Sequence, residues 1–191
     1  MRPLRVLALL LCASTLALAA SGCGGSTKTY SGAKPEAWAA TVCGALGDWA
    51  QGLKDDSALL SSDLNGTTDI NVVKAKFIAF LEKAERSSRT MVTRIGAAGP
   101  PAVKQGAAIE QQLVTGLEGA QTSFTRAIAR AKKLSTTNAQ VFATGVQALG
   151  GEVQKELTAV GQKFTALGDK YKDNTLHKAT AGEPSCKKIA G

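Results

Sequence analysis

Histidine, cysteine and aromatic residues are all scarce in this chain of 191 residues, which has one histidine, four cysteines, two tryptophans, two tyrosines and five phenylalanines. The single histidine, His177, has no Cys-x-x-Cys pair to complete a zinc site. The chain also lacks a Gly-x-Ser-x-Gly elbow and a glycine-rich phosphate loop. We therefore predict that the protein is not an enzyme and holds no metal or cofactor.

Long apolar runs are also rare, and the one that exists lies near the start of the chain. Residues 6–20 are almost wholly apolar and follow Arg2 and Arg5. A membrane-spanning helix needs roughly 20 apolar residues, so this run is short for an uncleaved anchor. A positive start, a short apolar run and small residues after it are typical of a signal peptide. Residues 1–22 are predicted to be one.

The small residues Ala20, Ser21 and Gly22 directly precede Cys23. This order resembles the lipobox of bacterial lipoproteins, which implies acylation of Cys23 and cleavage before it. Ala20 stands where the lipobox prefers leucine, so ordinary secretion with cleavage nearby remains the alternative. Two acyl chains hold a protein on a membrane where one binds only marginally. We expect an exported protein, lipid-anchored at the extracytoplasmic face of the cell membrane, with residues 23–34 as a flexible tether.

The cysteines then divide by position. Cys12 leaves with the signal peptide and Cys23 carries the lipid, so only Cys43 and Cys186 remain in the exported domain. Two cysteines outside the cell suggest a disulfide, with two free thiols as the alternative. A bridge closing so long a loop stabilises a fold by about 4–5 kcal/mol in the chain-entropy model.

Positive charge is in excess. The chain has 23 basic and 15 acidic residues and a net charge of +8, which falls to +6 once Arg2 and Arg5 leave with the signal. Such a balance favours anionic lipid headgroups or anionic polymers as partners, or another envelope protein. Export, few aromatics and the lack of a binding motif argue against nucleic acid. Alternatively, the lysines and arginines only keep an alanine-rich domain soluble.

Helical periodicity dominates the remainder, which is predicted to form one domain, 35–191. Apolar residues at steps of three and four predict helices at about 35–54, 69–95, 100–134 and 138–171. Residues 55–68 have a loop composition. Pro100 and Pro101 are expected to start the third helix, and a capping box of Thr137 and Gln140 the fourth. The predicted fold class is all-α: an antiparallel four-helix bundle with a disulfide-pinned C-terminal tail.

Glycines recur inside the predicted third and fourth helices, where each costs up to about 1 kcal/mol relative to alanine. Close helix approach or a kink at Gly150 and Gly151 is one explanation. The other is a cleft for an apolar ligand, because small residues leave space between helices. The residues expected to line such a cleft are Phe77, Phe124, Phe142 and Phe164.

Three short motifs are spread over nearly the whole domain. They are Trp38 with Val42 and Cys43, Gly99-Pro100-Pro101 with Gly106, and Pro184 with Cys186 and Lys187. In this order they resemble small lipoproteins and secreted proteins of actinobacteria. The resemblance implies an envelope location and a Cys43–Cys186 bridge, and it implies no activity.

Two functions are carried forward. The first is a noncatalytic, membrane-anchored envelope lipoprotein whose helical surface binds another protein or an anionic polymer. The second is a carrier of a lipid or small apolar ligand, which predicts a cavity among the four phenylalanines. An enzyme would require His177 to be buried beside a carboxylate and a hydroxyl; in a polar tail, a surface histidine is expected instead.

Overall fold

The computed structural model describes residues 29–171 and 175–190, and within these ranges the chain forms six α-helices and no strand. The helices are α1 (Pro35–Leu64), α2 (Ile70–Ala97), α3 (Gly106–Lys133), α4 (Ala139–Lys170), α5 (Thr175–Gly182) and α6 (Pro184–Ala190). The all-α prediction is therefore confirmed. The predicted signal peptide and Cys23 lie outside the described residues.

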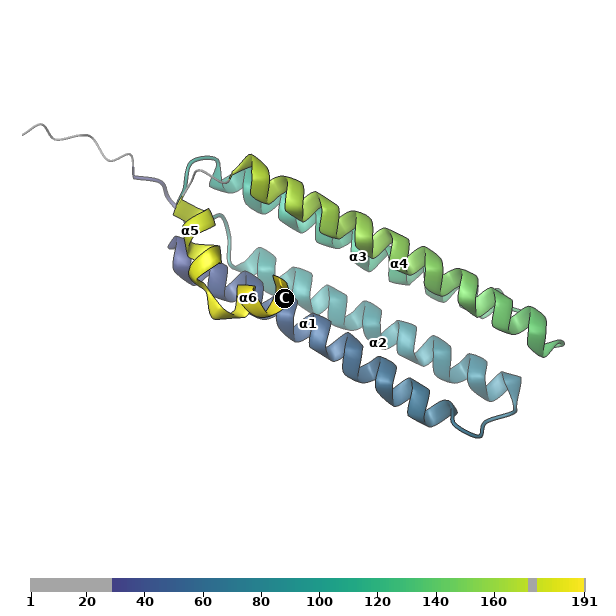
Figure 1. Cartoon of the computed structure of the whole chain (residues 1–191). Coiled ribbons are helices and arrows are strands. Elements are labelled where there is room, and N and C mark those ends of the chain that lie inside the picture. The colour runs from purple at the N-terminus through teal and green to yellow at the C-terminus, as the bar shows by residue number, and fades with distance from the viewer. Residues whose placement is uncertain (1–28, 172–174, 191) are drawn as a thin grey trace, which may run out of the picture.

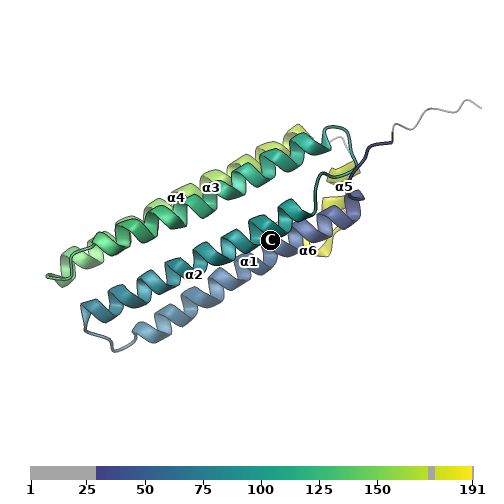
Figure 2. The same ribbon diagram turned by 180° about the vertical axis from the view of Figure 1, so that it is seen from behind.

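The four long helices lie side by side, each antiparallel to the one before it (Figures 1 and 2). Helices α2 and α3 pack against each other, α1 packs on α2, and α4 packs on α3. The short helices α5 and α6 both pack on α1. An α1–α4 pair, which would close a four-helix bundle, is not among the packed pairs of the described chain. A closed bundle is thus not confirmed.

Helix α1 is longer than the sequence pattern predicted. It continues to Leu64, so most of the predicted loop 55–68 is wrong. Its polar residues make helix-surface contacts: Gln51 donates to Asp55 at 2.7 Å, and Asp56 forms a 2.6 Å ion pair with Lys83 of α2. Polar composition here marks an exposed helix face. The helix ends only at the turn containing Gly66, whose φ of 74° favours glycine.

Helix α3 begins later than predicted, at Gly106 instead of Pro100. The prolines belong to a turn that pairs with the segment before α1. Ala33 donates to the carbonyl of Pro100 at 2.9 Å and accepts from the amide of Ala102 at 2.7 Å. A β-carbon at Gly106 would clash with the carbonyl oxygen of Pro101, so this close turn requires glycine.

The predicted capping box at the start of α4 is wrong. The side chain of Asn138 accepts a hydrogen bond from the amide of Val141 at 3.0 Å, which makes Asn138 the N-cap. Thr137 lies outside the helix, and its hydroxyl is within 2.9 Å of the Ser135 hydroxyl. Asparagine satisfies an orphan amide of the first turn without help from a glutamine three residues later.

The predicted C-terminal tail is also helical over 175–182 and 184–190. The disulfide is present: Cys186 of α6 is bonded to Cys43 of α1, with their Cα atoms 4.9 Å apart. Helices this short are marginal alone in water, so packing on α1 and the covalent bond stabilise them. The pinned segment is therefore a pair of helices instead of an irregular tail.

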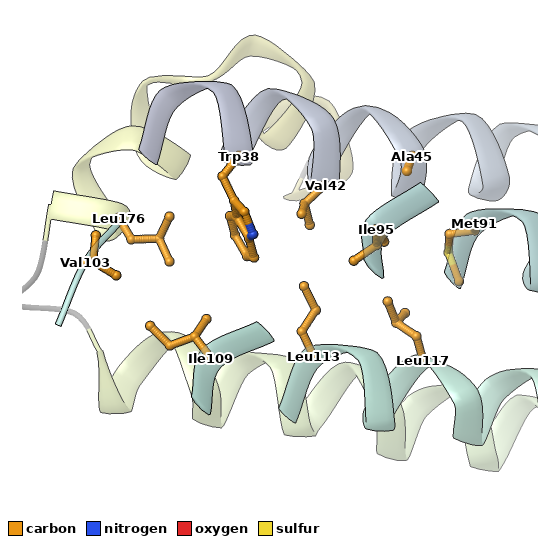
Figure 3. Packing of buried hydrophobic residues seen from close by; sticks show 10 residues of the cluster. All are labelled: Trp38, Val42, Ala45, Met91, Ile95, Val103, Ile109, Leu113, Leu117 and Leu176. Carbon is orange, nitrogen blue, oxygen red and sulfur yellow. The ribbon is translucent and has the colours of Figure 1, made fainter. Parts of the chain in front are cut away.

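Buried apolar residues form two clusters along the molecule. The first joins α1, α2, α3, the 98–105 turn and α5 around Ile95 and Leu117, which are almost fully buried (Figure 3). The second joins α2, α3 and α4 around Phe124 and Leu149. Helix α4 contributes no buried residue to the first cluster, and its Phe164 lies only partly buried at the edge. The apolar face of α4 is therefore incompletely covered.

Candidate apolar ligand groove

A hollow of about 540 Å³ lies between α1 and α4, and we call it the α1–α4 groove. This volume falls in the range of about 300–1,000 Å³ that small-molecule sites occupy. Its lining is mostly apolar. The lining residues are Trp38, Val42, Cys43, Leu46, Ile109, Leu113, Gly161, Phe164, Thr165, Leu167, Gly168, Tyr171, Leu176, His177, Thr180, Cys186 and Ile189.

The groove exists because α4 packs chiefly on α3, and α1 with α4 is not among the closely packed helix pairs of the described chain. On the groove side, α4 presents Phe164, Leu167 and Tyr171, all of which are only partly buried. The same stretch of α4 contains Gly161, one turn before Phe164, and Gly168, and an added β-carbon at either glycine would meet no atom within 4 Å. These two glycines thus widen the groove, and they require neither close helix approach nor a special backbone conformation.

The floor and the opposite wall come from the first core cluster. Ile109 and Leu113 of α3 line the groove, and Trp38 and Val42 of α1 face α3 (Figure 3). Trp38 is 5% exposed, and its indole N–H donates to the carbonyl of Gly99 at 2.9 Å. The one polar group of this side chain is therefore satisfied by backbone, and its ring contributes apolar surface to the site.

Helices α5 and α6 complete the groove where α1 begins and α4 ends. Leu176 and Thr180 of α5 and Ile189 of α6 are lining residues. The Cys43–Cys186 disulfide, itself part of the lining, holds α6 against α1. Sequence reasoning missed Leu176, Thr180 and Ile189, because α5 and α6 are too short to show an apolar period. His177 also lines the groove and is exposed, not buried.

The four phenylalanines predicted to share one cleft do not come together. Phe77 and Phe124 line a second, smaller hollow of about 170 Å³, whose lining residues come from α1, α2, α3 and α4. Phe164 lines the α1–α4 groove, whereas Phe142 is buried and lines neither hollow. The prediction of a single phenylalanine cleft is wrong, because Phe142 and Phe164 lie about 33 Å apart along one helix at 1.5 Å per residue.

Ion pairs fix α4 to α3. Arg126 pairs with Glu156 at 2.5 Å, and Arg130 pairs with Glu152. The hydroxyl of Ser123 also donates to Glu156, and this hydrogen bond, with the help of Arg126, lowers the pKa of the Glu156 carboxyl. These interhelical partners hold α4 in the position that leaves the groove open.

Two glutamates on α2 also have basic partners. Glu82 forms a 3.0 Å ion pair with Lys132 of α3. Glu85 is buried, pairs with Arg89 at 2.6 Å, and accepts from Gln121 at 3.2 Å. The hydrogen bond from Arg89 is the main cause that lowers the pKa of the Glu85 carboxyl, and it outweighs the opposing effect of burial. Both carboxylates thus have basic side chains as partners.

The part of the chain that the structure describes contains no group of three or more His, Cys, Asp or Glu side chains placed to hold a metal ion. None of its helices combines the length and the apolar character that crossing a bilayer requires.

No protein-family model, curated protein or solved structure matches the chain. The resemblance to small actinobacterial lipoproteins therefore stays a prediction, as do the lipid anchor at Cys23 and the extracytoplasmic location.

Proposed function

We propose that the protein is an exported, noncatalytic lipoprotein, anchored through Cys23, that binds the apolar chain of a lipid in the α1–α4 groove. The observation that carries the proposal is the groove itself. It is about 540 Å³ of largely apolar space bordered by α4, a helix that packs on α3 and forms no closely packed pair with α1 in the described chain. We interpret the four long helices as a bundle whose α1–α4 seam is kept open for a ligand.

The energetics favour an apolar occupant. Each buried methylene contributes about 0.8 kcal/mol. An acyl chain that covers Phe164, Leu167 and Tyr171 removes from water both its own apolar surface and the apolar surface of these side chains. Polar groups that would orient a hydrophilic ligand are few in the lining, and Trp38 has already donated its N–H to backbone. Binding therefore depends on shape and apolar area, which suits an acyl chain.

The fluorescence of Trp38 can report ligand binding directly, because Trp38 lines the groove while Trp49 does not. A chain that starts at Gly24 contains every described helix and both core clusters, so it is suitable for solution work. In a Trp49→Phe background, 9,10-dibromostearic acid is expected to quench the remaining tryptophan fluorescence, because bromine quenches at short range. Unbrominated stearic acid should compete and restore the signal.

A groove-filling variant provides the specificity control. Gly161→Leu places a side chain in open groove space, and Gly151→Leu makes the same change on an exposed turn of α4 that lines neither hollow. Both substitutions gain up to about 1 kcal/mol of helix propensity. We expect Gly161→Leu to weaken quenching at least tenfold and Gly151→Leu to leave it unchanged. Equal quenching in both variants, or none in the parent, would rule the proposal out.

The anchor is tested separately. Expression of the full chain in an actinobacterial host should place the protein in the membrane fraction with the mass of an acylated Cys23 as its first residue. The Cys23→Ala variant should lose both the acyl mass and the membrane association. A parent chain that is found in the culture medium without acyl mass would instead support ordinary secretion.

A further inference from the structure

Charge is distributed unevenly along the molecule. Six of the seven ion pairs of the described residues lie away from the end where α1 and α3 begin and α4 finishes, and the seventh joins Arg94, one turn before α2 ends there, to Asp48 of α1. We call that end the tether end, because the described chain enters it at residue 29 (Figure 1). At the opposite end, some lysines have acidic partners: Lys76 pairs with Asp63, and Lys132 with Glu82, whereas Lys133 forms no ion pair within the described chain.

The tether end, by contrast, carries exposed lysines that form no ion pair within the described chain. Lys34 precedes α1, Lys104 lies in the 98–105 turn, and Lys178 lies on α5. Lys163 and Lys170 of α4 and Lys187 and Lys188 of α6 extend the same surface. These seven lysines outnumber the acidic side chains around them, which are Glu36, Asp48, Glu110, Asp169 and Glu183, and Asp48 already pairs with Arg94. The local field is therefore positive.

Two exposed apolar side chains accompany the lysines. Tyr30 is 38% exposed just before α1, and Ile189 of α6 is 41% exposed and lines the groove. A tyrosine presents an apolar ring and a polar tip, a combination suited to the boundary between lipid and water. The α1–α4 groove reaches the same end through Tyr171 and Leu176.

We infer that the tether end is a docking surface for a bilayer rich in anionic phospholipid, with the groove directed at the lipid. The inference rests on the proposed function for the purpose of the groove, but the charge distribution stands independently. Lysines near an anionic surface contribute about 1 kcal/mol each. An acyl chain could then pass between the bilayer and the groove without crossing bulk water.

Vesicle partitioning tests this surface without the lipid anchor, using the chain from Gly24. It should bind vesicles of equal phosphatidylglycerol and phosphatidylcholine at low salt, and bind pure phosphatidylcholine weakly. Reversing three lysines of the tether end (Lys34→Glu, Lys104→Glu and Lys178→Glu) should weaken partitioning about 100-fold or more. Binding should also fall steeply toward 1 M salt, where the Debye length shrinks to about 3 Å.

The matched control reverses three exposed lysines elsewhere: Lys54→Glu, Lys133→Glu and Lys155→Glu. None of these forms an ion pair in the described chain, and the change in net charge is the same. The control should lose far less affinity. Equal loss in both triple variants would show that overall charge drives binding and would overturn the inference. So would equal binding to neutral vesicles, or binding to soluble polyglutamate with none to anionic vesicles.

The two proposals fail in different ways. The tether-end triple variant leaves every groove residue in place, so dibromostearic acid should still quench Trp38. Gly161→Leu fills the groove but keeps all the lysines, so it should still bind anionic vesicles. Loss of quenching in the parent chain with vesicle binding intact would remove the carrier function and leave the docking surface standing.

Discussion

At the scale of single residues, Glu85 shows how a buried charge is accommodated. Its carboxylate lies between Arg89 and Gln121, and the hydrogen bond from Arg89 is the largest cause that lowers its pKa below the ordinary value of 4.5. A carboxyl with a lowered pKa contributes stability that is complete above the ordinary value and is lost as pH falls through the lowered one. The contribution is therefore present at neutral pH.

We expect the Glu85→Gln variant to melt at a lower temperature than the parent at pH 7. The difference should shrink as the pH is lowered below about 4, because the parent then loses the same interaction through protonation. Thermal melts followed by circular dichroism between pH 3 and pH 7 would measure it. A gap between the two proteins that stays constant over this range would show that the charge of Glu85 is not the cause.

Gly106 and Gly119 make a second comparison at this scale. A β-carbon at Gly106 would collide with the backbone oxygen of Pro101, whereas one at Gly119 meets nothing within 4 Å. We expect Gly106→Ala to destabilise the fold by about 1–3 kcal/mol, as overpacking does. Gly119→Ala should stabilise it by about 0.5–1 kcal/mol through helix propensity. Urea unfolding of both variants would measure the two effects, and shifts of the same sign would contradict the turn geometry.

At the scale of elements, the start of α4 depends on Asn138. Its side chain accepts from the amide of Val141, while Thr137 makes no cap to the helix. Asn138→Ala should therefore cost about 1 kcal/mol, and Thr137→Ala should cost little. Differential scanning calorimetry of the two variants would decide the point. A larger loss in Thr137→Ala would restore the capping box that the sequence suggested.

The disulfide links the two helices that are farthest apart in sequence. Removing it with Cys43→Ala and Cys186→Ala should lower the stability by about 4–5 kcal/mol in the chain-entropy model, and α5 and α6 should then lose protection from hydrogen exchange before α2 and α3 do. A reductant should lower the melting temperature of the parent and leave that of the double variant unchanged. If both proteins respond equally to the reductant, the bond is not the restraint that holds these helices.

The elements also show how far sequence reasoning reached. The apolar period placed the centres of four long helices correctly, because a helix that buries one face repeats apolar residues on that face at every turn. The ends were less predictable: α1 extends past Lys54 through contacts such as Asp56 with Lys83, and α3 begins late because Pro100 pairs with Ala33. Both depend on residues distant in sequence. Helices α5 and α6 were missed because their stability comes from α1, not from their own pattern.

The groove was foreseen only in part. The glycines of α4 were recognised as a possible sign of space between helices, and Gly161 and Gly168 do line it. The phenylalanines were a weaker guide, since only Phe164 belongs to the groove. The open α1–α4 seam could not be predicted, because all four long helices carry an apolar stripe and periodicity does not say which stripes meet.

At the scale of the whole molecule, an occupied groove should stabilise the native state. A ligand present at 100 times its dissociation constant adds about 2.7 kcal/mol, or about 5–10 °C in melting temperature for a chain of this size. We expect stearic acid to raise the melting temperature of the parent and of Gly151→Leu, but not that of Gly161→Leu. A shift of the same size in all three would mean that the fatty acid binds elsewhere.

The pairing of α1 with α6 also imposes an order on assembly. Cys186 follows Cys43 by 143 residues, so α1 has been synthesised long before its covalent partner exists. During that interval Cys43 keeps its thiol, and the strip of α1 that includes Val42 and Leu46 lacks the cover of α5 and α6. Contacts so distant in sequence form late in folding. A chain halted after α4 would therefore differ from the finished protein in two ways: Cys43 would be a free thiol, and the apolar strip beside it would be exposed.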